Sequence, residues 1–345
     1  MHTRAALSLA LVLAAVPPHS RPGVRDTTVR FVSDEADAAL AILQSRAARR
    51  TPTLSQWNRF FSSEGYRALA RRDSSFDRPF SRDVYRAFLL SDTLLARTDA
   101  LARTLAAWKR IVIGRPAALA LAYLPAGTAL HATLFLEIKP QGNSFVFAVD
   151  GTPSIFLYVN PQETAAQLEN TMAHELHHIG VGSACGAAAE SSQPANVQQT
   201  REWMSAFGEG LAMLAAAGGA DVHPHALDDS ATKARWDKDV ANFNADLATV
   251  QAFFFDVLDQ RLPADSISAR GMSFFGIQGP WYTVGWKMAV KIEKTFGRER
   301  LIAEMCSPQK LLATYNEAIR ATHETGSSSV WSDSLLQRVG AIPSR

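Results

Sequence analysis

Residues 171–182 read TMAHELHHIGVG, and within them His174, Glu175 and His178 fit the pattern H-E-x-x-H. The two histidines of the pattern are four positions apart, so on an α-helix both project from the same face, one turn apart. At that spacing, two imidazoles can bind a single metal ion at about 2.0–2.1 Å. The sequence therefore predicts a helix here that carries half of a metal site.

Glu175 adjoins the first histidine of the pattern, where its carboxylate can reach a water molecule beside the metal rather than the metal itself. Two ligands and a general base are what this pattern supplies chemically. His177 lies about 100° around the helix from His178. It is interpreted either as polar surface or as a group that orients a ligand.

A catalytic zinc site usually has three protein ligands and one open position. The candidates for the third ligand are Glu190, Glu202, Glu209, His223 and His225. Glu209 is favoured because it lies mid-helix among small and apolar residues, where a carboxylate is costly to bury unless it is paired or binds a metal. The alternative is a surface glutamate on an amphipathic helix.

The neighbours of Glu209 refine this prediction. Gly208 and Gly210 flank it, and each glycine costs about 1 kcal/mol in a helix interior relative to Ala. We therefore expect close helix packing at this point, with the motif helix alongside. Glu202, seven positions earlier, could hold a ligand histidine by its free ring N–H, whereas His223 and His225 fit an exposed loop as well as a metal site.

The segments before the motif predict a small sheet. HATLFLEIK, SFVFAVD and SIFLYVN are rich in β-branched and aromatic residues, and the turn sequences PQGN and GTP separate them. Asn160 and Pro161 predict the start of the motif helix, and Gly180 or Gly182 its end. Most of the remaining chain has helical periodicity. The predicted fold class is mainly α with a small antiparallel β-sheet (α+β), with the motif helix after the sheet.

The first twenty residues are typical of a signal peptide. Arg4 precedes an apolar run, residues 5–16, which is too short to span a bilayer and ends at Pro17. We expect export to the periplasm or the exterior, with no stable membrane insertion once the segment is removed; an uncleaved anchor is the alternative. Residues 21–125 are then a helical N-terminal region and residues 126–345 the region that carries the site, within one continuous domain.

The composition of the chain limits the kinds of partner that it can bind. The chain has 345 residues, 47% of them hydrophobic, and a formal net charge of +2, so it can bury a large core and offers no electrostatic basis for binding nucleic acid. Cys185 and Cys306 are compatible with a disulfide in an exported protein, but their spacing leaves the pairing open, and Cys185 is disfavoured as a metal ligand. The sequence sets no oligomeric state.

The HELHH helix followed by a GEGLA helix resembles the gluzincin metallopeptidases, in which H-E-x-x-H is followed by a glutamate ligand on a second helix. GEGLA is similar to their N-E-G-F-A stretch, with Gly208 in place of Asn, whereas the aminopeptidase motif G-x-M-E-N is absent. The later segment GPWYTVGWKMA resembles a helix of uncharacterised bacterial zinc-dependent peptidases, the grouping to which the chain is most similar. The resemblance covers roughly residues 155–300. It implies a zincin-like core, Zn²⁺ held by His174, His178 and Glu209, and a peptide or protein substrate.

The resemblance also implies a mechanism in which Glu175 is the general base. Tyr282, at the start of GPWYTVGWKMA, is the candidate hydrogen-bond donor to the oxyanion, with a core aromatic as the alternative. One strand, SFVFAVD or SIFLYVN, is expected to pair with an extended peptide. The predicted function is an exported zinc-dependent peptidase. The alternatives are a catalytically inactive binding protein on a zincin scaffold and a zinc hydrolase of another amide or ester.

Overall fold

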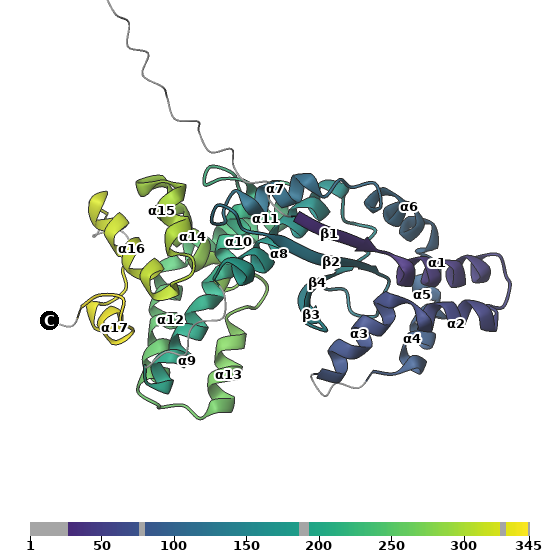
Figure 1. Cartoon of the computed structure of the whole chain (residues 1–345), viewed down its shortest axis with the longest axis horizontal. Coiled ribbons are helices and arrows are strands. Elements are labelled where there is room, and N and C mark those ends of the chain that lie inside the picture. Colours follow the sequence, from purple (N-terminus) through teal and green to yellow (C-terminus); the bar gives the residue numbers. More distant parts are fainter. Residues whose placement is uncertain (1–26, 76–79, 186–192, 325–328, 344–345) are drawn as a thin grey trace, which may run out of the picture.

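The computed structural model describes residues 27–75, 80–185, 193–324 and 329–343 (Figure 1). The predicted signal peptide lies outside these ranges. The strands are β1 (Thr27–Val32), β2 (Leu130–Glu137), β3 (Phe145–Val149) and β4 (Thr152–Tyr158). The helices that precede β2 are α1 (Asp34–Ala47), α2 (Leu54–Ser62), α3 (Glu64–Ser75), α4 (Arg82–Leu89), α5 (Asp92–Leu95), α6 (Thr98–Trp108) and α7 (Gly114–Leu121).

The helices that follow the sheet include one short 3₁₀ segment, η1. They are α8 (Ala165–Cys185), α9 (Ala195–Met204), η1 (Ser205–Phe207), α10 (Gly208–Ala217), α11 (Ser230–Ala241), α12 (Phe243–Leu258), α13 (Ala264–Ser273), α14 (Pro280–Phe296), α15 (Arg298–Glu304), α16 (Pro308–Ala321) and α17 (Asp333–Arg338). The predicted fold class, mainly helical with one small sheet, is confirmed.

The pairing of the sheet differs from the predicted antiparallel arrangement. The strand order is β1-β2-β4-β3, in which β1 and β4 run parallel to β2 and only β3 pairs antiparallel, with β4. The sequence suggested hairpins between strands that are neighbours in the chain. β1, which was not predicted, pairs with β2 although helices α1–α7 lie between the two strands in the chain. β2 is buried at all but one position, as expected for a central parallel strand covered on both faces.

A turn between β3 and β4 was predicted at GTP, and it lies one residue earlier, at Asp150 and Gly151, so that Thr152 and Pro153 belong to β4. Asp150 and Gly151 have φ of 49° and 78°, which is the pair of positive values that a two-residue hairpin turn of this hand requires. This turn folds β3 back along β4 and leaves β4 between β2 and β3. β4 then leads directly toward α8, so the sheet fixes where the motif helix begins.

α8 starts later and ends later than predicted. Asn160 Oδ1 accepts a hydrogen bond from the backbone N–H of Gln162, which makes a turn rather than a helix cap. The cap is instead reciprocal: Thr164 Oγ1 accepts from the backbone N–H of Gln167, and Gln167 Oε1 accepts from that of Thr164. The helix continues past Gly180 to Cys185. Cys185 forms a disulfide with Cys306, which lies 121 residues further along the chain.

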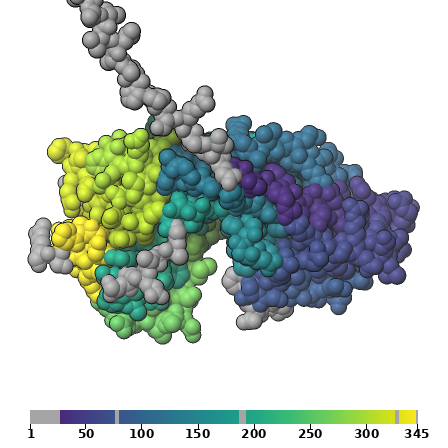
Figure 2. Space-filling model, in the orientation of Figure 1, coloured from purple at the N-terminus to yellow at the C-terminus, as the bar shows by residue number. Residues whose placement is uncertain are grey.

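One continuous hydrophobic core runs from Val32 to Val339. Helices α1–α6 gather at one end of the sheet, α12–α17 lie at the opposite end of the molecule, and α8 and α10 lie between (Figure 1). Figure 2 shows a hollow between the N-terminal part and the C-terminal part at one edge of the molecule. Among the helices of the described ranges, none has the length and apolarity needed to cross a bilayer. The predicted division at residue 125 stays a prediction.

Candidate metal centre

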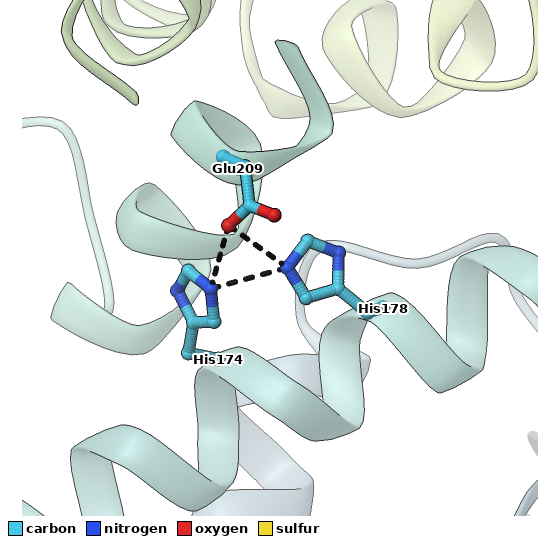
Figure 3. A group of neighbouring side chains, drawn as sticks. All are labelled: His174, His178 and Glu209. Atoms are coloured by element: carbon cyan, nitrogen blue, oxygen red, sulfur yellow. Dashed lines mark hydrogen bonds and ion pairs between the residues drawn. The ribbon is translucent and has the colours of Figure 1, made fainter. Parts of the chain in front are cut away.

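α8 positions the two histidines by burying its opposite side. Leu168, Met172, Leu176 and Ile179 recur at steps of three and four residues and are at most 6% exposed, so they form the apolar face that anchors the helix. α7 and β2 are among the elements that pack against α8. The ring of His174 and that of His178 therefore project away from this anchored face (Figure 3).

Glu209 approaches from α10, the helix that packs beside α8 (Figure 3). Gly210, the next residue, is buried where α10 crosses α14: a Cβ there would lie 2.0 Å from the backbone nitrogen of Trp286 and 2.3 Å from the carbonyl carbon of Gly285. The close packing predicted from the glycines is thus real but faces α14 rather than α8. Gly208 has open space around it.

The two glycines around Glu209 give a matched pair of variants. Gly210→Ala drives a methyl group into the backbone of α14, and we expect it to lower the free energy of unfolding by about 1–3 kcal/mol or more. Gly208→Ala meets nothing within 4 Å and should be neutral or stabilising by up to about 1 kcal/mol. Denaturant unfolding of both variants checks this, and equal effects of the two would contradict the described packing of α10 on α14.

Three side chains converge on one point. His174 Nε2 and His178 Nε2 are 3.1 Å apart, and Glu209 Oε2 lies 3.1 Å from the first and 3.3 Å from the second. The side chains of His174, His178 and Glu209 are 13%, 26% and 19% exposed, so the cluster is mostly shielded from water. Among the described residues, this is the one group of three that could hold a metal ion.

The dimensions of this triangle fit zinc. Ligand atoms that bind zinc tetrahedrally at about 2.0–2.1 Å lie about 3.3–3.4 Å from one another, close to the separations of the three atoms here. Nitrogen and oxygen lone pairs crowded this closely repel each other unless a proton or a cation lies between them. Two histidines and a glutamate are also a known donor set for catalytic zinc.

The pKa values of Glu209 and His178 indicate that the site favours a positive charge next to the carboxylate. Burial by itself raises the pKa of the Glu209 carboxyl, but hydrogen bonds from His174 and His178 outweigh it and hold the pKa well below its usual range. Burial lowers the pKa of His178, and Glu209 reverses this and raises it. The carboxylate is thus kept ionised, as a metal ligand must be.

Tyr282, on α14, lies beside the triangle. Its ring is 6.3 Å from that of His174, centroid to centroid, at an interplanar angle of 20°. Burial, together with the negative charges of Glu209 and Glu175, raises the pKa of its phenol well above the usual range. The hydroxyl therefore keeps its proton at neutral pH, and a hydrogen bond to Glu209 contributes to the shift.

Glu175 is half-buried on α8. Its negative charge raises the pKa of both His178 and Tyr282. The carboxylate therefore interacts electrostatically with one residue of the triangle and with the tyrosine beside it. It is not one of the three converging groups. The role of Glu175 as a general base stays a prediction.

His177 is not polar surface, contrary to one of the two interpretations of the sequence. Its side chain is 1% exposed, and burial lowers the pKa of its imidazole to about 3. The ring is therefore neutral at physiological pH. It lies 6.5 Å from the ring of His178, centroid to centroid, on the buried side of α8 rather than in the triangle.

The other candidate ligands do not join the three. Glu202 is exposed on α9. η1 interrupts the helix between Glu202 and Glu209, so the two residues do not share the face that an unbroken helix would give them. His223 Nε2 lies 3.1 Å from Asp237, and His225 Nδ1 lies 2.6 Å from Asp228. Glu190 lies outside the described residues.

A pocket of about 430 Å³ adjoins the triangle, and the sequence did not predict it. His174 and Tyr282 line it, together with Asn170 and Thr171, which precede His174 by one turn on α8. The signal that could have found these two residues is their spacing of four and three positions from a predicted ligand. The remaining walls come from Gln167 on α8, Met213 on α10, the segment just before α8, and the loops that precede α11 and α14.

The comparison with known families agrees with this site. Residues 57–324 match the DUF5700 family, described as "Putative zinc dependent peptidase", and because the match covers more than half of the chain, the protein belongs to this family. The association with zinc predicted from the sequence is confirmed at the level of the family. No curated protein and no solved structure matches the chain.

Proposed function

We propose that this protein is a zinc-dependent peptidase in which His174, His178 and Glu209 bind the metal. The observation that carries the proposal is the convergence of Nε2, Nε2 and Oε2 at separations of 3.1–3.3 Å in a mostly buried position. These separations match a tetrahedral zinc ion. The family assignment points independently to the same metal and the same class of reaction.

The residues around the triangle have different roles in the proposed hydrolysis of an amide bond. Zinc at such a site acts as a Lewis acid and makes water a nucleophile near neutral pH. Glu175 takes the proton of the attacking water and passes it to the leaving amine. Tyr282, protonated at neutral pH, donates a hydrogen bond to the carbonyl oxygen as negative charge develops there.

The sheet offers one place for an extended peptide. β4 is paired on both sides, whereas β3 pairs with β4 alone among the described residues. Of the two strands that the sequence suggested, β3 is therefore the one whose open edge can add a peptide strand. β3 also packs close to α8.

Export is part of the proposal. The predicted signal peptide supports it, and so does the disulfide between Cys185 and Cys306, because disulfides persist mainly in oxidising compartments. The two cysteines therefore serve the fold rather than the metal.

The experiment is hydrolysis of an unbiased peptide mixture by the chain without residues 1–20, analysed by mass spectrometry. We expect cleavage that a zinc chelator abolishes and that added Zn²⁺ restores. A parallel assay with ester and non-peptide amide substrates separates the alternatives. Turnover of these substrates alone would replace the peptidase by another hydrolase, and zinc binding without any turnover would indicate a binding protein.

A further inference from the structure

The pocket beside the triangle is placed to hold a part of the substrate next to the reacting bond. Its volume of about 430 Å³ lies within the range of small-ligand pockets. Gln167, Asn170 and Thr171 line it from the face of α8 one to two turns before His174. Because His174 and Tyr282 belong to the pocket and flank the proposed reaction centre, a substrate side chain adjacent to the cleaved bond can enter it.

Glu163 gives this pocket a half-buried carboxylate. Its Oε1 accepts a hydrogen bond of 3.2 Å from the hydroxyl of Thr171. Burial raises the pKa of Glu163 to about 7; the bond from Thr171 lowers it, and the charge of Asp228 raises it further. Desolvating a carboxylate costs free energy that a cation bound beside it recovers.

A second acid and a histidine line the same pocket. Asp228 Oδ1 accepts from Gln167 Nε2 at 2.7 Å, and its Oδ2 lies 2.6 Å from His225 Nδ1. His225 is 4% exposed, and its Nε2 has no hydrogen-bond partner among the described residues. These contacts hold the carboxylate of Asp228 in the wall of the pocket that Glu163 also lines.

The other lining residues of the pocket are consistent with a ligand that has a positive charge and an apolar stem. Neither Lys nor Arg lines the pocket in the part of the chain that the structure describes, whereas Met213, Pro224 and Leu227 supply apolar surface. A long aliphatic stem fits such surface while its charged end seeks acceptors. An acidic side chain would meet Glu163 and Asp228 and is excluded by like charge.

We propose that this pocket binds the basic side chain, lysine or arginine, of a residue next to the cleaved peptide bond. Its ammonium or guanidinium group is held by Glu163, beside Asp228, and its stem lies along Met213 and Leu227. The inference rests on the proposed peptidase function and adds a substrate class to it. Glu163 determines specificity here and takes no part in the reaction itself.

The test uses a set of N-acetylated, C-amidated fluorogenic peptides that differ at one position beside the cleaved bond, which carries Lys, Arg, norleucine or Glu. With the zinc-loaded chain, kcat/KM should be about tenfold or more higher for Lys and Arg than for norleucine, because a charge-assisted hydrogen bond in a buried site is strong. The peptide with Glu should be the poorest. Equal rates for Lys and norleucine would overturn the proposal without any variant.

Glu163→Gln is the informative substitution, since it keeps an acceptor for Thr171 and removes only the charge. It should reduce the preference for Lys over norleucine to about twofold or less, mainly through KM. Glu169→Gln is the matched control: it removes a carboxylate from α8 that pairs with Arg115 outside this pocket, and it should keep the wild-type preference. An unchanged preference in Glu163→Gln would contradict the assignment.

A binding measurement distinguishes a failure of this inference from a failure of the proposed peptidase function. Anisotropy titration of the Lys and norleucine peptides with the Glu175→Gln variant reads the pocket without turnover. Tighter binding of the Lys peptide that is lost in Glu163→Gln/Glu175→Gln supports the pocket even if no peptide is cut. Cleavage of the peptides without a preference would overturn the assignment of the pocket and leave the proposed peptidase function standing.

Discussion

Glu175→Gln should leave zinc binding intact and lower kcat by about 10²–10⁴-fold, the usual contribution of a general acid–base group. Glutamine has nearly the shape of glutamate but cannot accept the proton of the attacking water. Because Glu175 is not one of the converging ligand atoms, its amide should not disturb the metal. Zinc content and kcat, measured on the same sample, check both halves of this expectation.

Two companion variants sharpen that result. Glu169→Gln makes the same chemical change on the same helix, at a residue that pairs with Arg115, and should keep full activity. Tyr282→Phe removes the proposed donor to the oxyanion and should lower kcat by about 10²–10³-fold, as loss of one oxyanion donor does elsewhere. A Glu175→Gln variant that hydrolyses peptides at the wild-type rate would show that the base has been misassigned.

Glu209→Ala should weaken zinc binding by more than about a hundredfold, because losing a group that merely orients a ligand already costs about 10–100-fold. The substitution removes one corner of the triangle and leaves His174 and His178 as two ligands 3.1 Å apart. Hydrolysis should fall with the loss of metal and return only in part at high zinc. Competition titration against a chromophoric chelator measures the affinity.

Glu202→Ala is the control for this experiment, since Glu202 lies on the preceding helix and is exposed. It should bind zinc as the wild type does. Equal weakening by both substitutions would mean that general loss of negative charge, rather than loss of a ligand, explains the result. Unchanged affinity in Glu209→Ala would remove Glu209 from the site.

The part of the site that sequence could predict is the part fixed by short-range geometry. His174 and His178 come together because a helix places positions four apart on one face. Glu209 was found because a carboxylate among Gly, Ala and Leu needs a partner. Neither argument required knowledge of where other segments lie.

The mispredicted features depend on distant contacts. The helix expected to run unbroken to Glu209 is interrupted at η1, where Phe207 is fully buried with its ring 5.1 Å from that of Trp281 and 5.7 Å from that of Trp331. Gly210 packs on α14, some 75 residues further along the chain, and not on the motif helix. Tertiary packing of this kind overrides local helix propensity.

The sheet and the pocket were missed for the same reason. Strand β1 pairs with β2 across about a hundred residues, and no local pattern specifies such a parallel neighbour. The pocket joins residues before α8, the loop that carries His225, and the start of α14. Glu163 looks like an ordinary helix-start residue until these segments are brought together.

The central claim is that His174, His178 and Glu209 bind a catalytic zinc ion. The most direct measurement is zinc analysis combined with X-ray absorption on the chain loaded with zinc and freed of excess metal. We predict about one zinc per chain, with nitrogen and oxygen neighbours at about 2.0–2.1 Å, an imidazole signature and no sulfur. A chain that retains no zinc, or a metal with sulfur neighbours, would contradict the account.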